Sequence, residues 1–303
     1  MKKIICYNIT EKQAGKSVEL FLKSLGYSKN IIVHLRNTPM GLTVSGDLVY
    51  TTYILKAGQK LTVTLIEEQS SHNIVPVPMK LSIVYEDEDI LVVNKQAGVP
   101  IHPSQGNFSN TLANGLAWYF QEKGQAFVYR AINRLDRDTT GLLIVAKHML
   151  SACILSAMVA SRQIHREYLA VVRGMTLQKG QVEAPIARVH HSTIERCVNY
   201  AEGDKARTFY KRLCYNPDCR CSLLSLHLES GRTHQIRVHM KAIGHPLPGD
   251  FLYNPDYHYI RRQALHSHRL KFSHPLTGEK MCFTAPIPED MRFALNPPDF
   301  EIP

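Results

Sequence analysis

The chain has 303 residues, with 36 Lys and Arg against 26 Asp and Glu, a formal net charge of +10 at pH 7 and a pI near 9.2. This length suffices for one large and one small domain, and the basic excess favours a polyanion such as nucleic acid without proving one. No apolar run approaches the roughly 18 residues that span a bilayer, and the N-terminus lacks the apolar core of a signal peptide, so we expect a cytoplasmic protein without membrane contact.

The first 68 residues predict a small separate domain. Its first helix is indicated by apolar residues at helical spacing: Val18, Phe21, Leu22 and Leu25. Gly26 follows as a stop, Ser28 can cap a second helix, and residues 41–65 are typical of strands joined by turns. Basic side chains occur on or near both helices: Lys23, Lys29, His34 and Arg36. They favour RNA contact, although a helical cap whose charges merely face water is the competing interpretation.

Residues 69–80 are polar and then interrupted by prolines, which predicts a linker, and residues 81–303 form the main domain. Strands are expected at 82–95, 142–147, 166–173, 206–214, 221–228, 264–272 and 279–285. Helices are expected at 111–123, 149–160 and 234–243. Hairpin-like spacing without repeated strand–helix–strand units predicts an α+β domain with a mainly antiparallel, mixed β-sheet.

The segment NRLDRDTTGLLIVAK, residues 133–147, is the most informative part of the main domain. It places Asp136 beside Arg134 in a turn that leads directly into the apolar strand 142–146. A nearby guanidinium offsets the desolvation that would otherwise raise the pKa of a buried carboxylate. The turn therefore suits a catalytic aspartate held in its charged form. Asp138 is the nearest rival carboxylate, and we expect it to have a supporting role at most.

The cysteines and histidines do not predict a metal site. Seven cysteines scattered through the chain suit a reducing compartment better than a disulfide framework. Cys214, Cys219 and Cys221 lack Cys-x-x-Cys spacing, so small half-buried thiols are expected there rather than zinc ligands. His234 and His239 do not form a His-Glu-x-x-His motif, and we expect them in the core or facing RNA.

The run RLDRDTTGLLIVAK resembles the signature of the RluA family of RNA pseudouridine synthases. Further segments resemble the family in the right order: 91–103, 166–174, 231–250 and 264–279. The resemblance therefore covers roughly residues 80–290. Asn133 stands where the family usually has His, and Gln96 stands where it usually has Pro. Neither departure touches the aspartate.

The resemblance implies an antiparallel sheet with helices packed on it and an active cleft along its middle. It also implies that the N-terminal domain is an S4-like α/β RNA-binding domain. Asp136 matches the catalytic aspartate, and Arg232 matches an arginine that pairs with this aspartate and helps to open the RNA stem. Tyr168 matches a tyrosine that stacks on the target base, and Leu265 matches an aliphatic residue near that base. Arg134 is expected to contact the RNA.

These expectations predict that the protein is an isomerase, which converts uridine to pseudouridine in structured RNA without a metal or an organic cofactor. Asp136 either attacks C1′ or C6 as a nucleophile or takes a proton from the ribose, and the sequence does not choose between these roles. The S4-like segment favours 23S ribosomal RNA, with transfer RNA as the alternative. A non-catalytic RNA-binding assembly factor and a two-carboxylate glycoside hydrolase, using Asp136 with Asp138 or Asp250, are the competing classes. A monomer is the default expectation.

Overall fold

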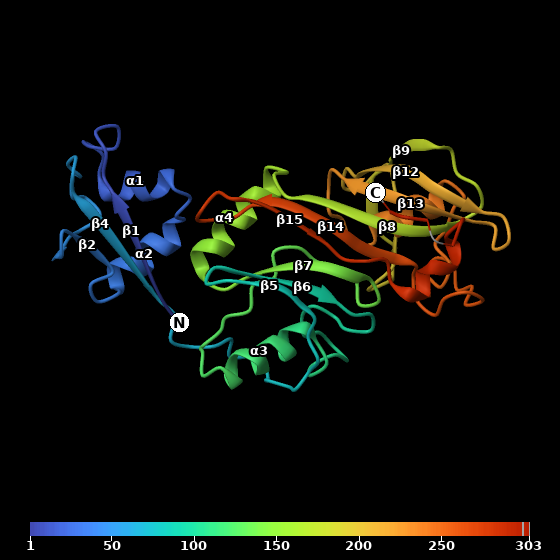
Figure 1. Ribbon diagram of the computed structural model, residues 1–303, viewed down its shortest axis with the longest axis horizontal. Helices are drawn as coiled ribbons and strands as arrows, with labels where there is room; N and C mark the ends of the chain where they lie inside the picture. The colour runs from blue at the N-terminus through green and yellow to red at the C-terminus, as the bar shows by residue number, and fades with distance from the viewer. Residues whose placement is uncertain (299, 303) are drawn as a thin grey trace.

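The computed structural model describes residues 1–298 and 300–302 of the chain, and Figure 1 shows a small N-terminal sheet unit beside a long second sheet. The N-terminal unit contains β1 (Lys2–Asn8), α1 (Val18–Ser24), α2 (Lys29–Asn37), β2 (Leu42–Val44), β3 (Asp47–Leu48) and β4 (Lys60–Ile66). Its strands pair antiparallel in the order β1-β4-β2-β3. The two predicted helices are confirmed, and Ser17 and Ser28 cap them with side-chain oxygens. The strand β1 was not predicted.

The segment 69–80 has no helix or strand, as predicted, yet it packs closely on the main sheet unit. Ser70 Oγ accepts from the Phe127 backbone N–H at 3.1 Å, and Ser71 Oγ accepts from the Tyr129 N–H at 3.0 Å. Asn114 Nδ2 donates to the Val75 carbonyl at 2.8 Å. These bonds hold the connecting segment along the surface instead of leaving it as a free tether.

The second sheet is mixed and mainly antiparallel, as the α+β prediction requires. Its strands are β5 (Ile83–Glu86), β6 (Ile90–Lys95), β7 (Thr140–Ala146), β8 (His165–Arg173), β9 (Lys179–Glu183), β12 (Arg207–Asn216), β13 (Cys221–Leu228), β14 (Leu265–Ser273) and β15 (Lys280–Thr284). They run in the order β5-β6-β7-β14-β8-β13-β12-β9, with β15 on β14. Only the β7–β14 pair is parallel among these described strands. Each predicted strand region contains a strand.

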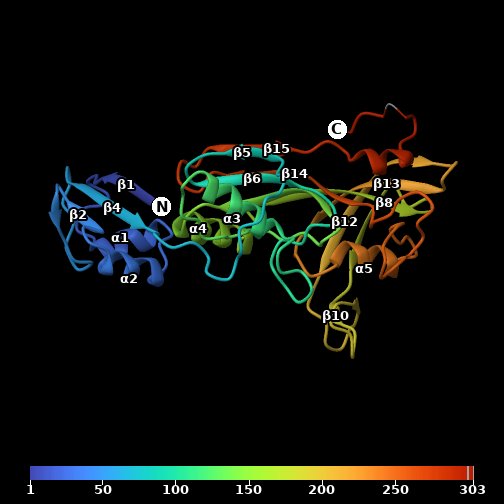
Figure 2. The ribbon, with the colours of Figure 1, turned by 90° about the horizontal axis from the view of Figure 1, so that it is seen from below.

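The predicted helices α3 (Leu112–Glu122) and α4 (Met149–Ala160) cover opposite faces of β6 and β7. Leu91 and its neighbours on one face pack with α3, whereas Ile90 and its neighbours on the other face pack with α4. Because both faces are covered, β7 is buried at every residue. The third helix, α5 (Gln235–Ala242), lies at the far end of the sheet beside the projecting ribbon of β10 (Ile186–Arg188) and β11 (Arg196–Val198), as Figure 2 shows. A 3₁₀ helix, η1 (Glu289–Ala294), follows β15.

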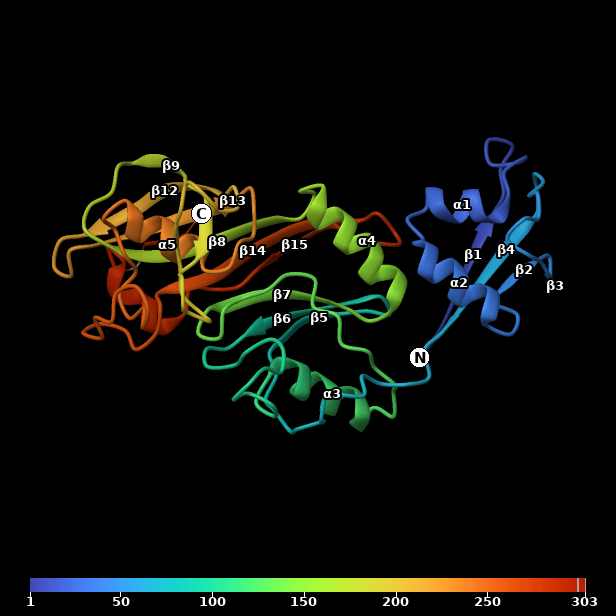
Figure 3. The same ribbon diagram turned by 180° about the vertical axis from the view of Figure 1, so that it is seen from behind.

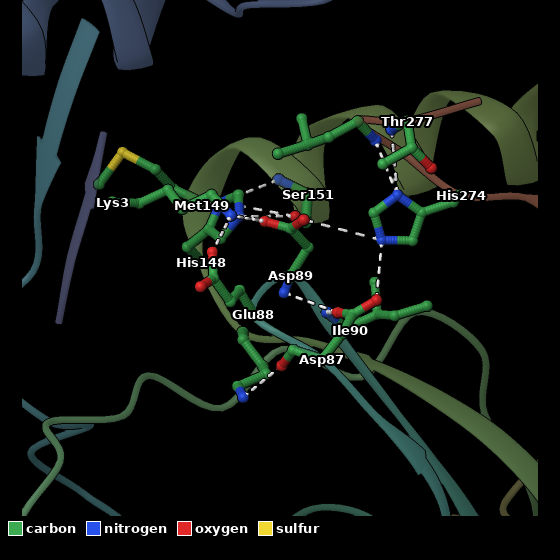
Figure 4. Close-up of polar contacts among 12 residues, drawn as sticks. Lys3, Asp87, Glu88, Asp89, Ile90, His148, Met149, Ser151, His274 and Thr277 are labelled. Carbon is green, nitrogen blue, oxygen red and sulfur yellow. Dashed lines mark hydrogen bonds and ion pairs between the residues drawn. The ribbon is translucent and has the colours of Figure 1, made fainter. Parts of the chain in front are cut away.

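The N-terminal unit is attached to the main sheet unit through the start of α4, which lies between them in Figure 3. Leu150 of α4 is fully buried in the apolar core of the N-terminal unit. Lys3 Nζ lies 2.7 Å from Asp89 Oδ1, and His148 Nε2 lies 2.8 Å from the same oxygen (Figure 4). Glu67 accepts from the Met149 backbone N–H at 3.1 Å. Within the described residues, no helix is long and apolar enough to cross a membrane.

Candidate active site

Asp136 lies in a tight turn that enters β7. The Thr139 N–H donates to the Asp136 carbonyl at 3.1 Å and closes the turn. Gly141 follows with φ +109°, and a Cβ at this position would lie 2.2 Å from the Ser267 carbonyl oxygen. The position therefore requires glycine, because β14 approaches the backbone of β7 too closely for a side chain. The turn is thus fixed at the point where the two strands meet.

Arg237, on α5, makes the ion pair with Asp136. Its Nη1 lies 2.8 Å from Asp136 Oδ2, and its Nε and Nη2 donate to the two oxygens of Asp250 at 2.7 and 2.8 Å. Asp250 is fully buried and also accepts from the backbone N–H groups of Leu252 and Tyr253. Burial alone would lower the pKa of Arg237, but the neighbouring carboxylates outweigh it and raise that pKa. The guanidinium therefore stays charged and holds one oxygen of Asp136 in place.

The five residues predicted for the site converge on one small hollow of about 60 Å³. They are Arg134, Asp136, Tyr168, Arg232 and Leu265. A larger hollow of about 730 Å³ continues from it and shares Arg134, Asp136 and Arg237 in its wall. Its volume lies in the range of known ligand sites. Asp136, whose side chain is 19% exposed, thus faces open space large enough for part of a polymer substrate.

Tyr168 of β8 and Leu265 of β14 form the apolar side of the small hollow. Both are buried, at 4% and 5% exposure, and both belong to the main core. Burial raises the pKa of Tyr168, so the phenol stays neutral at physiological pH. A neutral aromatic ring beside an aliphatic side chain suits contact with a nucleobase face.

The structure differs from the expected pairing of Asp136 with Arg232. Arg232 is 45% exposed and lies 3.1 Å from Asp204 Oδ2, while Arg237 occupies the place beside the aspartate. Arg134, expected beside Asp136, is also exposed at the rim. The reason is that Arg232 precedes α5, whereas Arg237 lies within this helix on its buried side at 1% exposure. In the sequence, the only sign of this role for Arg237 was its position between the apolar residues Ile236 and Val238.

Two further residues support the site and were not predicted in this role. His234 adopts a left-handed backbone, with φ 58°; its Nε2 lies 3.8 Å from Asp136 Oδ2 and its Nδ1 lies 2.9 Å from the Tyr253 hydroxyl. Burial lowers the pKa of His234 to about 4, so the ring is neutral at pH 7. Lys95 donates to the carbonyls of Gln96, Val99 and Arg137 at 2.8 to 2.9 Å.

Lys95 is therefore a buried bridge between the end of β6 and the turn that carries Asp136. Burial lowers the pKa of its amine to about 7, and the charges of Asp138 and Asp136 act in the opposite direction. The three carbonyl acceptors match the three donors of an ammonium group. Asn133 is a second such bridge: its side chain accepts from the Ile144 N–H at 2.9 Å. Asn133, which stands where the RluA family usually has His, therefore supports the turn.

One group of side chains in the described residues has the spacing of a metal site: Asp87, Asp89 and His274 (Figure 4). The two carboxylates of this group already have partners. Asp87 accepts from the Tyr85 hydroxyl and two backbone N–H groups, and Asp89 is held by Lys3 and His148. His274 Nδ1 accepts from two backbone N–H groups, so its ring proton lies on Nε2, 3.0 Å from Asp87 Oδ2. Asp87 and Asp89 thus serve to join structural elements, and His274 Nε2 lies near both without a hydrogen bond of good geometry.

Known proteins resemble this chain in sequence and in structure. Residues 89–242 match the family model described as RNA pseudouridylate synthase. The chain is 44% identical to "Uncharacterized RNA pseudouridine synthase YjbO" of Bacillus subtilis (strain 168), over 91% of this chain and 96% of that protein. It is 37% identical to "Ribosomal large subunit pseudouridine synthase D" of Zymomonas mobilis, over 94% of each chain. Among solved structures, "Human RNA Pseudouridylate Synthase Domain Containing 1" matches with a TM-score of 0.58 and 28% identity, over 68% of this chain and 83% of that chain.

Proposed function

The chain belongs to the RNA pseudouridylate synthase family and is an RNA pseudouridine synthase, and from that premise we propose that Asp136 performs the isomerisation on uridines of 23S ribosomal RNA. The observation that supports this role is the contact between Asp136 and the buried Arg237 inside a hollow lined by Tyr168 and Leu265. The resemblance to the RluA enzymes predicted the same aspartate from the sequence.

The reaction breaks the N1–C1′ bond of uridine, turns the free base and joins C5 to C1′. The hydrogen leaves C5 and N1 gains one, so atoms and electrons balance without an oxidant or reductant. Asp136 supplies either the nucleophile at C1′ or C6 or the base that takes a proton from the ribose. In both roles Arg237 orients the carboxylate before the substrate arrives, through the contact of its Nη1 with Asp136 Oδ2.

The apolar side of the hollow recognises the base. A uridine in structured RNA must leave its stack to reach Asp136, at a cost of a few kcal/mol. Contact with Tyr168 and Leu265 offsets part of that cost, and Arg134 and Arg232 at the rim are placed for the phosphates. Neutral His234 lies next to the reacting carboxylate and limits its movement without adding charge.

The choice of ribosomal RNA rests on relatives and on the N-terminal unit. The Zymomonas mobilis relative is named for the large ribosomal subunit, and the same assignment is proposed for this chain. We further propose that residues 1–68 form an S4-like RNA-binding domain, joined by residues 69–80 to the catalytic domain 81–303. Two short helices against a small sheet, with Lys29 and Arg36 exposed on α2, support this division.

Pseudouridine mapping tests the proposal. Ribosomal and transfer RNA from cells lacking this protein is treated with carbodiimide and read by primer extension, alongside cells complemented with wild type or Asp136→Ala. The expected result is loss of specific sites in 23S ribosomal RNA, restored by the wild type alone. Loss of sites only in transfer RNA would show that transfer RNA is the substrate. Restoration by Asp136→Ala would show that Asp136 is not the catalytic residue.

A further inference from the structure

A second hollow of about 580 Å³ lies beside the active site and takes no part in the chemistry described above. It is formed by the turn after α4 and by the ends of β8, β12, β13 and β14. Arg166 of β8 and Leu228 of β13 line both this hollow and the small hollow at Asp136. The two spaces are therefore neighbours at the point where β8 begins and β13 ends.

The wall of the second hollow carries two stacked rings. Phe209 of β12 and His227 of β13 are cross-strand partners, with ring centroids 5.0 Å apart and planes inclined by 11°. His227 is exposed and Phe209 is half-buried, so the pair remains open to a ligand. Nearly parallel rings on a rigid sheet form a platform on which a further flat ring can stack.

The rim of the hollow is mainly basic. His165 and Lys271 are exposed cross-strand partners, and Arg162 in the turn after α4 is 67% exposed. The two acidic side chains of the rim are already engaged. Glu167 accepts from Ser225 at 2.7 Å and pairs with Arg269. Glu229 pairs with Arg207 at 3.3 Å and with Arg162 of the same rim at 3.7 Å.

A flat aromatic wall with basic side chains around it is the chemistry that recognises a nucleotide. We propose that this hollow binds one unpaired nucleotide next to the target uridine of the substrate RNA. Its base stacks on Phe209 and His227, and the phosphate that links it to the target lies at Arg166. This inference rests on the proposed function, because the target uridine must occupy the hollow at Asp136.

Arg166 is placed for the linking phosphate. It lines both hollows, and a Cβ built on Gly231 would lie 3.3 Å from its Nη1, so the guanidinium lies against the loop before α5. A free nucleotide offers the same base and phosphate as a nucleotide within RNA. The continuity of the two hollows favours RNA, because one strand can fill both at once.

The physical need for such a site follows from base extrusion. When the target uridine leaves its stack, its neighbour also loses one stacking partner. A platform close to the active site replaces that partner and lowers the cost of holding the RNA open. The gain is the same before and during the chemical step, so it affects substrate binding and leaves kcat unchanged.

The test uses the full-length protein and a transcript of ribosomal RNA that contains a site identified by mapping. We expect the double variant Phe209→Ala, His227→Ala to raise KM for this transcript about tenfold while kcat stays within about twofold. The milder double variant Phe209→Leu, His227→Asn should give an intermediate KM. It keeps the proposal testable if the alanine variant does not fold. Tyr259→Ala is the matched control, because it opens another stacked pair, with Phe293 at 5.0 Å and 7°, outside both hollows.

A second measurement locates the nucleotide directly. A transcript with 4-thiouridine next to the target is irradiated, and we expect crosslinks to the peptides that carry residues 209 and 227. Crosslinks elsewhere, or an unchanged KM in both double variants, would overturn the proposal. Saturable binding of uridine 5′-monophosphate that the double variant abolishes, together with an unchanged KM for the transcript, would assign the hollow to a free nucleotide instead. Failure of the wild type to form pseudouridine in any RNA would refute the proposed function separately.

Discussion

Asp250 holds Arg237 by two of its three guanidinium nitrogens, so that only Nη1 is left for the aspartate of the active site. The carboxylate of Asp250 is completely buried and the side chain of Arg237 is 1% exposed. A charged pair in this environment is rigid, since either partner left alone would be buried without compensation. The position of Asp136 therefore depends on a residue that never touches it.

Replacement of Asp136 should separate binding from chemistry. Asp136→Asn keeps the size of the side chain but removes the charge, and we expect pseudouridine formation to fall by a factor of about 10³ or more while RNA affinity changes little. Single-turnover assays and filter binding measure the two quantities. Asp138→Asn is the control, and it should keep most of its activity; equal losses in both variants would point to a general effect on the turn.

Loss of Asp250 should reduce both stability and rate. In Asp250→Asn the buried Arg237 loses its charged partner, and we expect the free energy of unfolding to fall by about 3 kcal/mol. We also expect kcat to fall at unchanged KM, because Arg237 then no longer fixes Asp136. Urea denaturation and steady-state kinetics give both values. Glu183→Gln, at a bidentate but exposed contact to Arg207, should leave the free energy of unfolding nearly unchanged, because water screens this pair.

His234 should make the protein sensitive to mild acid. Burial lowers its pKa in the folded state to about 4, against 6.5 for the ordinary value. Between pH 6.5 and pH 4 the unfolded chain therefore binds more protons at this residue, and its contribution to stability, fully present above pH 6.5, is lost as the pH falls. The wild type should lose more stability over this range than His234→Gln, as measured by urea denaturation at several pH values. Parallel curves for the two proteins would contradict the expectation.

The attachment of the N-terminal unit should depend on Leu150. Leu150→Ala removes an apolar side chain from the interface with that unit, and Leu155→Ala removes one of the same size from the contact with the main sheet. Both variants should lose about 3 kcal/mol of stability. We expect Leu150→Ala alone to expose residues 69–80 to protease, because this change loosens the N-terminal unit. Equal protection in both variants would show that the polar contacts at Lys3 suffice.

The elements with clear periodicity could be predicted from the sequence. The helices that begin after Ser17 and Ser28 have both a cap and an apolar face, and residues 142–146 of β7 are a continuous apolar run. The strand at 2–8 was missed because lysines and other polar residues hide its alternation at the edge of a sheet. The short strands β9 to β11 carry too few apolar residues to be distinguished from loops.

The sequence predicted that Asp136 shares a site with Tyr168 and Leu265, and all three line one hollow, but the ion-pair partner of Asp136 could not be predicted. Arg232 and Arg237 occur within the same short motif, and their separation in the sequence does not reveal which one faces Asp136. The left-handed backbone at His234 and the start of α5 determine which arginine pairs with Asp136. They bury Arg237 beside the carboxylate and leave Arg232 exposed to solvent. Such a choice depends on the path of the backbone in three dimensions.

The place of β14 in the sheet has a consequence for biosynthesis. This strand lies between β7 and β8, and its pairing with β7 joins His266 to Thr140 across more than a third of the chain. Contacts of such long sequence separation form late, since a large loop must first be closed. While the ribosome is still making residues 265–273, the two halves of the sheet have no strand to join them and Asp136 lacks the wall that Leu265 supplies. The enzyme can therefore become active only after β14 has been made and has paired with both of its neighbours.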